Sequence, residues 1–193
     1  MTNAEMKLVL ASQSPRRREL LQLAGYSFEV IPPRDGVECG GLTRESPQEL
    51  VARLAYQKAA DVAGRCAKAI IIGCDTVAEC DGQILGKPAN RNQARQMLKL
   101  MSGRTHHVYS GLCLWRNPDK KTLVKVEATK LQMNELPDDT LEEHLDHGRW
   151  QGKAGGFGFQ EGLEWVRIVA GSESNVVGLP MELFAKMLAE ISS

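Results

Sequence analysis

Three consecutive arginines, Arg16, Arg17 and Arg18, follow a serine and a proline at the predicted start of a helix. Each cation there costs about 0.3–1 kcal/mol, because the N-terminal end of a helix carries a partial positive charge. A phosphate chain would offset this repulsion, since free helix N–H groups and guanidinium groups both bind oxyanions. The alternative is three solvated arginines that point apart. The arginine run therefore predicts phosphate binding.

Asp75 follows an apolar run, Ala69 to Gly73, that is typical of a buried strand. An ionised carboxylate there is costly to desolvate unless it binds a cation or hydrogen-bond donors. Asp75 is therefore a candidate metal ligand or catalytic base, and the alternative is an aspartate bonded to a neighbouring loop.

Lys87 follows a predicted hairpin turn at Asp81-Gly82 and could neutralise charge on a transferring phosphate. An exposed lysine without a catalytic role is the alternative.

Two common glycine-rich nucleotide loops are excluded. The spacing from Gly82 to Lys87 is wrong for a Walker A loop, and Pro88 stands where Ser or Thr should coordinate magnesium. The stretch Gly155 to Gly158 does not continue a strand into the dinucleotide-binding fingerprint. His144 and His147 have a spacing that a metal could use, but a polar helix face is the preferred interpretation.

The composition excludes several classes of partner. The 193 residues include 24 basic and 24 acidic side chains, so no net charge attracts the chain to nucleic acid or to an anionic membrane. The five cysteines are scattered and never form C-x-x-C, which argues against a disulfide framework and a zinc site. No apolar run approaches the roughly 18 residues of a membrane span. These patterns predict a cytoplasmic protein that binds neither nucleic acid nor membrane.

Apolar runs alternate with helical patterns, which indicates an α/β fold. The predicted strands are Lys7 to Ala11, Phe28 to Ile31, Ala69 to Gly73, Val77 to Cys80, Gln83 to Leu85, Val108 to Trp115, Thr122 to Met133, and one near Trp165 to Val169. The predicted helices are Pro15 to Gly25, Pro47 to about Gly64, Asn92 to Met101, Asp138 to about His147, and one from Pro180. Asp75 and Thr76 are expected at the C-terminal end of a strand, where open α/β sheets bind ligands.

Seven segments in order resemble the motifs of the Maf family, and the resemblance extends from Lys7 to about Ala189. They are Leu10 to Arg17, Leu54 to Ala59, Gly73 to Val77, Leu85 to Pro88, Met101 to His106, Lys153 to Gln160, and Ser174 to Pro180. The resemblance implies one domain, residues 1–193, with a two-lobed, mixed-sheet α/β fold like that of the inosine-triphosphate pyrophosphatases. It places the active cleft between the lobes.

The resemblance also implies an activity, namely hydrolysis of a nucleoside triphosphate to the monophosphate and pyrophosphate with magnesium or manganese. Its implied phosphate ligands are Ser12, Arg16, Arg17 and Lys58, with Lys87 as a neutralising cation. Glu38 and Asp75 would be the acidic pair that holds the metal and activates the attacking water, with Asp35 as the alternative to Glu38. A homodimer is implied as well.

Thr76 and Gln160 resemble the branch of the family that acts on dTTP and UTP. The branch that acts on 7-methyl-GTP typically has Gln after the aspartate. A hydroxyl and an amide suit a pyrimidine edge, because each offers a donor and an acceptor. The alternatives are a 7-methyl-GTP pyrophosphatase and a non-catalytic nucleotide sensor linked to cell division and septum formation. The presence of both Asp75 and Glu38 favours the enzyme.

Overall fold

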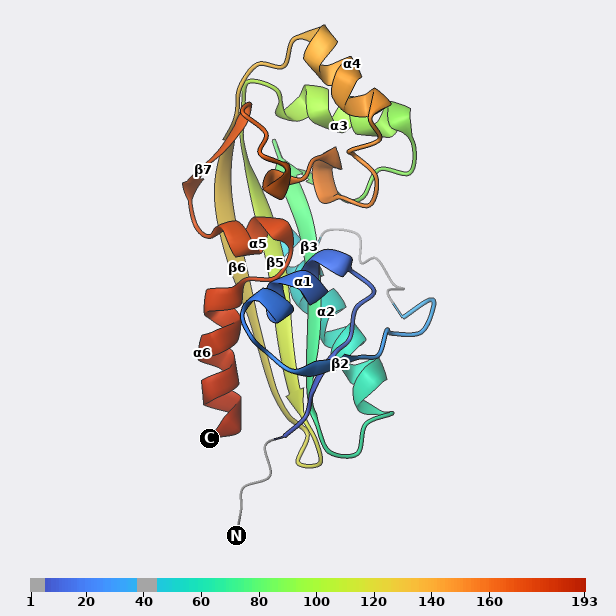
Figure 1. Ribbon diagram of the computed structural model, residues 1–193, viewed down its shortest axis with the longest axis vertical. Helices are drawn as coiled ribbons and strands as arrows, with labels where there is room; N and C mark the ends of the chain where they lie inside the picture. The colour runs from blue at the N-terminus through green and yellow to red at the C-terminus, as the bar shows by residue number, and fades with distance from the viewer. Residues whose placement is uncertain (1–5, 38–44) are drawn as a thin grey trace. The chain divides into compact units, whose positions relative to one another are not determined.

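The computed structural model describes residues 6–37 and 45–193 (Figure 1). Within these residues, seven strands form one mixed sheet in the order β2-β1-β3-β5-β6-β7, with β4 beside β3. The strands are β1 Leu8–Leu10, β2 Phe28–Val30, β3 Ile70–Cys80, β4 Gln83–Leu85, β5 Thr105–Arg116, β6 Lys121–Met133 and β7 Val166–Ala170. Strands β1, β2 and β3 pair in parallel, whereas the pairs β3–β4 and β6–β7 are antiparallel. The predicted α/β class with a mixed sheet is confirmed.

The helices also agree with the predicted positions. They are α1 Pro15–Leu23, α2 Pro47–Ala63, α3 Arg91–Met101, α4 Asp138–Asp146, α5 Glu173–Val177 and α6 Met181–Ser192, and two short 3-10 turns span Ala154–Gly156 and Phe159–Glu161. The sequence patterns did not predict α5 or the 3-10 turns. Along the described ranges, no helix combines the length and apolarity needed to cross a membrane.

Strand β3 is longer than predicted, and this corrects the expected position of the central aspartate. Asp75 and Thr76 lie in the middle of β3, not beyond its C-terminal end. The strand continues because its second half pairs with β4, with Ala78 opposite Leu85. Asp81 and Gly82 join the two strands with φ angles of 50° and 77°, as a two-residue hairpin turn requires. Asp75 is therefore held on a regular strand.

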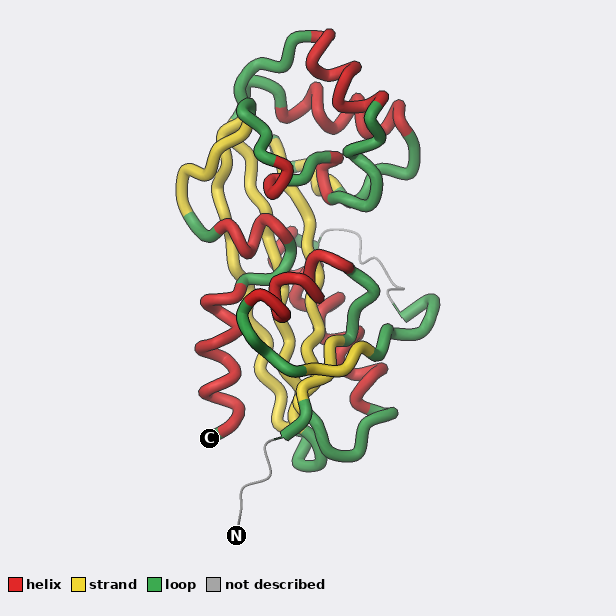
Figure 2. The backbone as a smooth tube through the Cα atoms, viewed as in Figure 1, coloured by secondary structure: helices red, strands yellow, loops and turns green. Residues whose placement is uncertain are grey.

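The chain divides into two compact units, and β3, β5 and β6, drawn yellow in Figure 2, contribute residues to both. The first unit contains Met1–Asp75, Ser110–Glu127 and Gly178–Ser193, and the second contains Thr76–Tyr109 and Ala128–Val177. The core of the first unit includes Leu10, Ile72, Leu112, Leu114 and Phe184, all fully buried. That these units form a single domain with an active cleft stays a prediction.

In the first unit, helix α2 lies directly against β3 and β5, because the contacting positions on those strands are glycines. A Cβ atom added at Gly73 would lie 2.2 Å from the Ala55 carbonyl oxygen, and one added at Gly111 would lie 2.1 Å from that of Val51. Any larger residue would push the helix away from the sheet. This close approach positions the side chains of α2 relative to those of β3.

The start of α2 is fixed by a capping box. The Ser46 hydroxyl accepts a hydrogen bond from the Glu49 N–H at 3.3 Å, and the Glu49 carboxylate accepts one from the Ser46 N–H at 2.9 Å. Pro47 occupies the first turn, where its missing N–H has no helical partner to lose. The sequence Ser-Pro-x-Glu therefore begins the helix at a defined residue.

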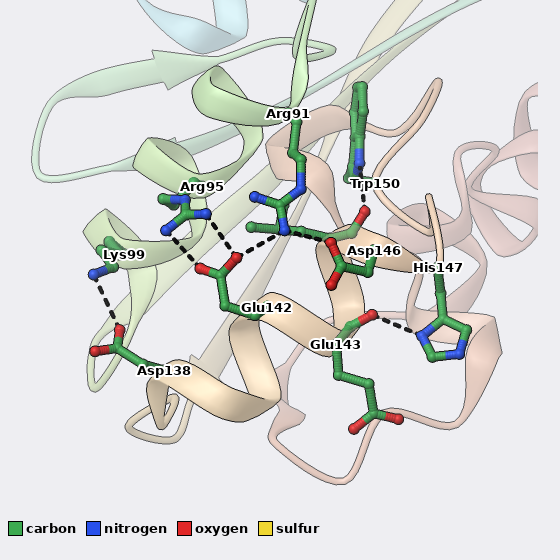
Figure 3. A network of polar contacts seen from close by, with 10 residues as sticks. Arg91, Arg95, Lys99, Asp138, Glu142, Glu143, Asp146, His147 and Trp150 are labelled. Atoms are coloured by element: carbon green, nitrogen blue, oxygen red, sulfur yellow. Dashed lines mark hydrogen bonds and ion pairs between the residues drawn. The ribbon is translucent and has the colours of Figure 1, made fainter.

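In the second unit, ion pairs join α3 to α4 (Figure 3). Arg91 pairs with Glu142 and Asp146, Arg95 pairs with Glu142 at 2.6 Å, and Lys99 pairs with Asp138 at 3.1 Å. These pairs are partly exposed, so each contributes little by itself to stability, but all of them join the same two helices.

Helix α4 carries two histidines with different environments. His147 is exposed, whereas His144 is buried and its Nε2 lies 2.9 Å from the Gly156 carbonyl oxygen. The prediction of a polar helix face is therefore wrong for His144. Burial lowers the pKa of His144, so its ring stays neutral and donates a hydrogen bond to the glycine-rich segment.

His106, on β5, predicts a pH dependence of stability. It is 1% exposed, its ring packs edge-on against Phe157, and burial lowers its pKa from 6.5 to about 4. The unfolded chain binds the proton more tightly than the folded chain does. The contribution of neutral His106 to the free energy of unfolding is therefore fully present above pH 6.5 and decreases as the pH falls toward 4. The expected loss is about 3 kcal/mol, because one pKa unit corresponds to about 1.4 kcal/mol.

The test is urea unfolding between pH 7 and pH 4 for the wild type and His106→Phe. The wild type should lose about 3 kcal/mol more than the variant across this range. His147→Gln, at an exposed histidine, is the control and should follow the wild type. Parallel pH profiles for the wild type and His106→Phe would contradict the prediction.

Candidate active site

The residues that follow β1 form a hydrogen-bonded cluster around Ser12. The Ser12 Oγ accepts hydrogen bonds from the Ser14 N–H at 3.1 Å and from Arg17 Nη1 at 3.2 Å. The Arg17 Nε also donates to the Gly178 carbonyl oxygen at 2.7 Å. Ser12 and Arg17 are 5% and 9% exposed. The three arginines of α1 therefore differ, because Arg17 is buried against the protein.

The other two arginines of the run are more accessible. Arg16 is half-buried and Arg18 is exposed. The alternative of three solvated arginines is wrong for Arg17. The assignment of Arg16 and Arg17 to phosphate binding stays a prediction.

A buried ion pair joins α2 to β3. Lys58 Nζ donates to Asp75 Oδ1 at 2.6 Å, and the two side chains are 8% and 13% exposed. Desolvating either charge alone would be costly, so each compensates the other. The partner of Asp75 is therefore Lys58 on helix α2 and not a neighbouring loop, which was the alternative from the sequence. The pair places a carboxylate and an ammonium group together, as phosphoryl chemistry needs.

The carboxylate of Asp75 fits one mode of metal binding. Magnesium is commonly held by one or two carboxylates together with water and substrate phosphates, not by a complete protein cage. In residues 6–37 and 45–193, no cluster of three or more His, Cys, Asp or Glu side chains suited to a metal is present. Glu38 lies outside the described residues, and its alternative, Asp35, is exposed. The acidic pair stays a prediction.

In the second unit, the segment that carries Lys87 is bonded to the glycine-rich segment. The Gly155 N–H donates to the Gly86 carbonyl oxygen at 3.0 Å. Lys87 itself is exposed. The structure therefore joins two of the predicted motifs through their backbones.

The glycine-rich segment ends in a short turn that is held by a lysine. Lys153 Nζ pairs with Glu161 and donates to the Arg149 carbonyl oxygen at 2.5 Å. Gln160 is exposed in the 3-10 turn Phe159–Glu161, next to this ion pair, and Thr76 is half-buried in β3. The roles of Thr76, Lys87 and Gln160 stay predictions.

The sequence reasoning missed the anchor of Arg17. The Gly178 carbonyl oxygen accepts from Arg17 Nε and also from the Cys74 thiol at 3.3 Å. Gly178 and Arg17 are 161 residues apart, so no local spacing could have paired them. The only signal was the motif Ser174 to Pro180, to which the sequence assigned no contact.

The chain is similar to known proteins along nearly its whole length. A family model described as Maf-like protein matches residues 7–191. A dTTP/UTP pyrophosphatase of Rhodopirellula baltica is 55% identical over 182 residues, which cover 94% of this chain and 80% of the relative. A dTTP/UTP pyrophosphatase of Carboxydothermus hydrogenoformans is 40% identical over 186 residues, which cover 96% of this chain and 98% of the relative.

Among solved structures, a nucleoside-triphosphatase described as a dITP/XTP pyrophosphatase, from Mycobacterium abscessus, is 16% identical. It aligns with a TM-score of 0.46 over 96% of this chain and 98% of its own. The family match and the relatives with 40–55% identity decide the assignment. The chain belongs to the Maf family.

Proposed function

We propose that this protein is a dTTP/UTP pyrophosphatase that hydrolyses the bond between the α- and β-phosphates and releases the nucleoside monophosphate and pyrophosphate. The observation that carries the proposal is the 55% identity to the dTTP/UTP pyrophosphatase of Rhodopirellula baltica over 94% of this chain. The buried Lys58–Asp75 pair supplies the groups that this reaction needs.

In this proposal Asp75 is the general base. The oxygen of a water attacks the α-phosphorus, the bond from that phosphorus to the bridging oxygen breaks, and pyrophosphate leaves with the bond electrons. Asp75 accepts the proton of the water. Protonation removes the negative charge that Lys58 faces at 2.6 Å, so the lysine becomes available to a phosphate oxygen. Arg16 and Lys87 neutralise further charge on the leaving group.

A magnesium or manganese ion held by Asp75, with Glu38 as the second proposed ligand, would withdraw negative charge from the phosphate oxygens. The protein positions the remaining groups: Asp75 lies on strand β3, and Lys58 lies on helix α2, which packs closely against that strand. A homodimer stays part of the proposal, as does a cytoplasmic setting, which the scattered cysteines support.

Thr76 and Gln160 are proposed to bind the pyrimidine edge. The hydroxyl and the amide each provide a donor and an acceptor, so a base with the wrong pattern would leave a polar group without a partner. The alternatives are an enzyme specific for 7-methyl-GTP and a sensor that binds nucleotide without cleaving it.

The test is an incubation of the purified protein with magnesium or manganese and each common nucleoside triphosphate or 7-methyl-GTP, followed by chromatography of the products. We expect dTTP and UTP to give monophosphate and pyrophosphate faster than the purine nucleotides. Cleavage of 7-methyl-GTP alone would contradict the proposed base recognition. Nucleotide binding without cleavage under both metals would favour the sensor.

A further inference from the structure

The hydrogen bonds around Ser12 define what its hydroxyl can do. A serine hydroxyl has two acceptor lone pairs and one proton to donate. Two N–H groups, from Ser14 and from Arg17, already donate to this oxygen at 3.1 and 3.2 Å. Both lone pairs are therefore used, and the O–H proton is directed away from these two donors. Ser12 is restricted to the role of a hydrogen-bond donor.

Arg17 is fixed so that it can impose this restriction. Its Nε donates to the Gly178 carbonyl oxygen at 2.7 Å, while its Nη1 reaches Ser12. The same carbonyl accepts from the Cys74 thiol at 3.3 Å. Because the guanidinium group is planar, the bond to Gly178 sets the direction of the Nη1 donor toward Ser12.

We propose that Arg17 is a positioning residue that orients the Ser12 hydroxyl as a donor to a phosphate oxygen of the nucleotide. The inference rests on the proposed function and changes the predicted role of Arg17, which would act through Ser12 and not through its own contact with phosphate. A phosphate oxygen is the expected acceptor, because it offers only lone pairs and bonds strongly to an oriented O–H group. A donor fixed before binding also loses less entropy when the ligand arrives.

The test is a double-mutant cycle with Ser12→Ala and Arg17→Met, read both as KM and kcat for dTTP and as the Kd of inorganic pyrophosphate from calorimetry. Each single variant should weaken pyrophosphate binding about 10-fold, or about 1.4 kcal/mol, because each removes a hydrogen bond on which the contact with a charged phosphate oxygen depends. In the Ser12→Ala background, Arg17→Met should add less than about 3-fold. Lys68→Met, at an exposed lysine with no assigned binding role, is the control and should bind as the wild type does.

Additive effects of the two substitutions would overturn the inference, since they would show that Arg17 contributes to binding or folding independently of Ser12. If Arg17→Met does not fold, Arg17→Lys replaces it. The lysine keeps the charge but lacks the planar fork, so pyrophosphate binding should again fall about 10-fold. Wild-type affinity in the lysine variant would mean that charge alone matters and would reject the positioning role.

Ser12→Thr retains a hydroxyl and should restore most of the affinity that Ser12→Ala loses. Failure of this rescue would also count against the inference. The cycle separates the two proposals, because pyrophosphate binding is measured without turnover. A wild-type protein that cleaves no nucleotide would reject the proposed function, and the coupling between Ser12 and Arg17 would still be decided by calorimetry.

Discussion

Asp75→Asn is expected to lower kcat for dTTP by roughly 100- to 10,000-fold, the range that a general base contributes. The amide cannot accept the proton of the attacking water, but its oxygen can still accept the hydrogen bond from Lys58 that the carboxylate accepts at 2.6 Å. The substitution therefore removes the chemistry while keeping the buried contact. Steady-state rates of pyrophosphate release measure the effect.

Circular dichroism and the melting temperature establish whether the Asp75→Asn variant is folded. Asp61→Asn is the matched control, because Asp61 lies on α2 and its carboxylate pairs with Arg65 at 2.7 Å, not with Lys58. The control should turn over as the wild type does. A folded Asp75→Asn variant with undiminished turnover would reject Asp75 as the base.

Gly111→Ala is expected to destabilise the first unit by about 3 kcal/mol or more, because overpacking against backbone cannot be relieved by a side-chain rotation. The new methyl group would lie 2.1 Å from the Val51 carbonyl oxygen and 2.3 Å from its carbonyl carbon. Helix α2 must then move away from the sheet. For a protein of this size the melting temperature should fall by roughly 6–12 °C.

Gly64→Ala, at the end of the same helix, is the matched control. Its backbone has helical angles and its nearest neighbour, the Asp61 carbonyl oxygen, would be 3.6 Å from the added atom. This variant should be as stable as the wild type or up to about 1 kcal/mol more stable, because alanine restricts the unfolded chain. Equal melting temperatures for Gly111→Ala and the wild type would disprove the close contact between α2 and β5.

Much of the fold was predictable because apolar periodicity and turn residues act locally. The helix beginning at Pro47 and the turn at Asp81-Gly82 were both placed correctly. The extent of β3 was not predictable, because the polar residues Asp75 and Thr76 interrupt its apolar run. The pairing with β4 carries the strand through them, and a pattern read along one segment does not contain that pairing.

The site was predictable in its residue types but not in its contacts. The sequence motifs singled out Lys58 and Asp75 separately, whereas their pairing depends on glycines that let α2 approach the sheet. The three arginines of α1 looked equivalent in sequence. Only the packing of distant segments distinguishes Arg17, whose anchor at Gly178 lies near the other end of the chain.

The discontinuous composition of the first unit has a consequence for biosynthesis. Its core combines Leu8 and Leu10 of β1 with Phe184, Met187 and Ile191 of α6. Strand β1 therefore cannot complete its packing until residues more than 170 positions later in the sequence have been made. The second unit is complete once residue 177 has been made. Such long-range closure slows folding, since loop entropy is lost before the contacts form. On the ribosome, the segment that carries Ser12 and Arg17 therefore stays without its bond to the Gly178 carbonyl oxygen until that residue has been made, which is after the last residue of the second unit.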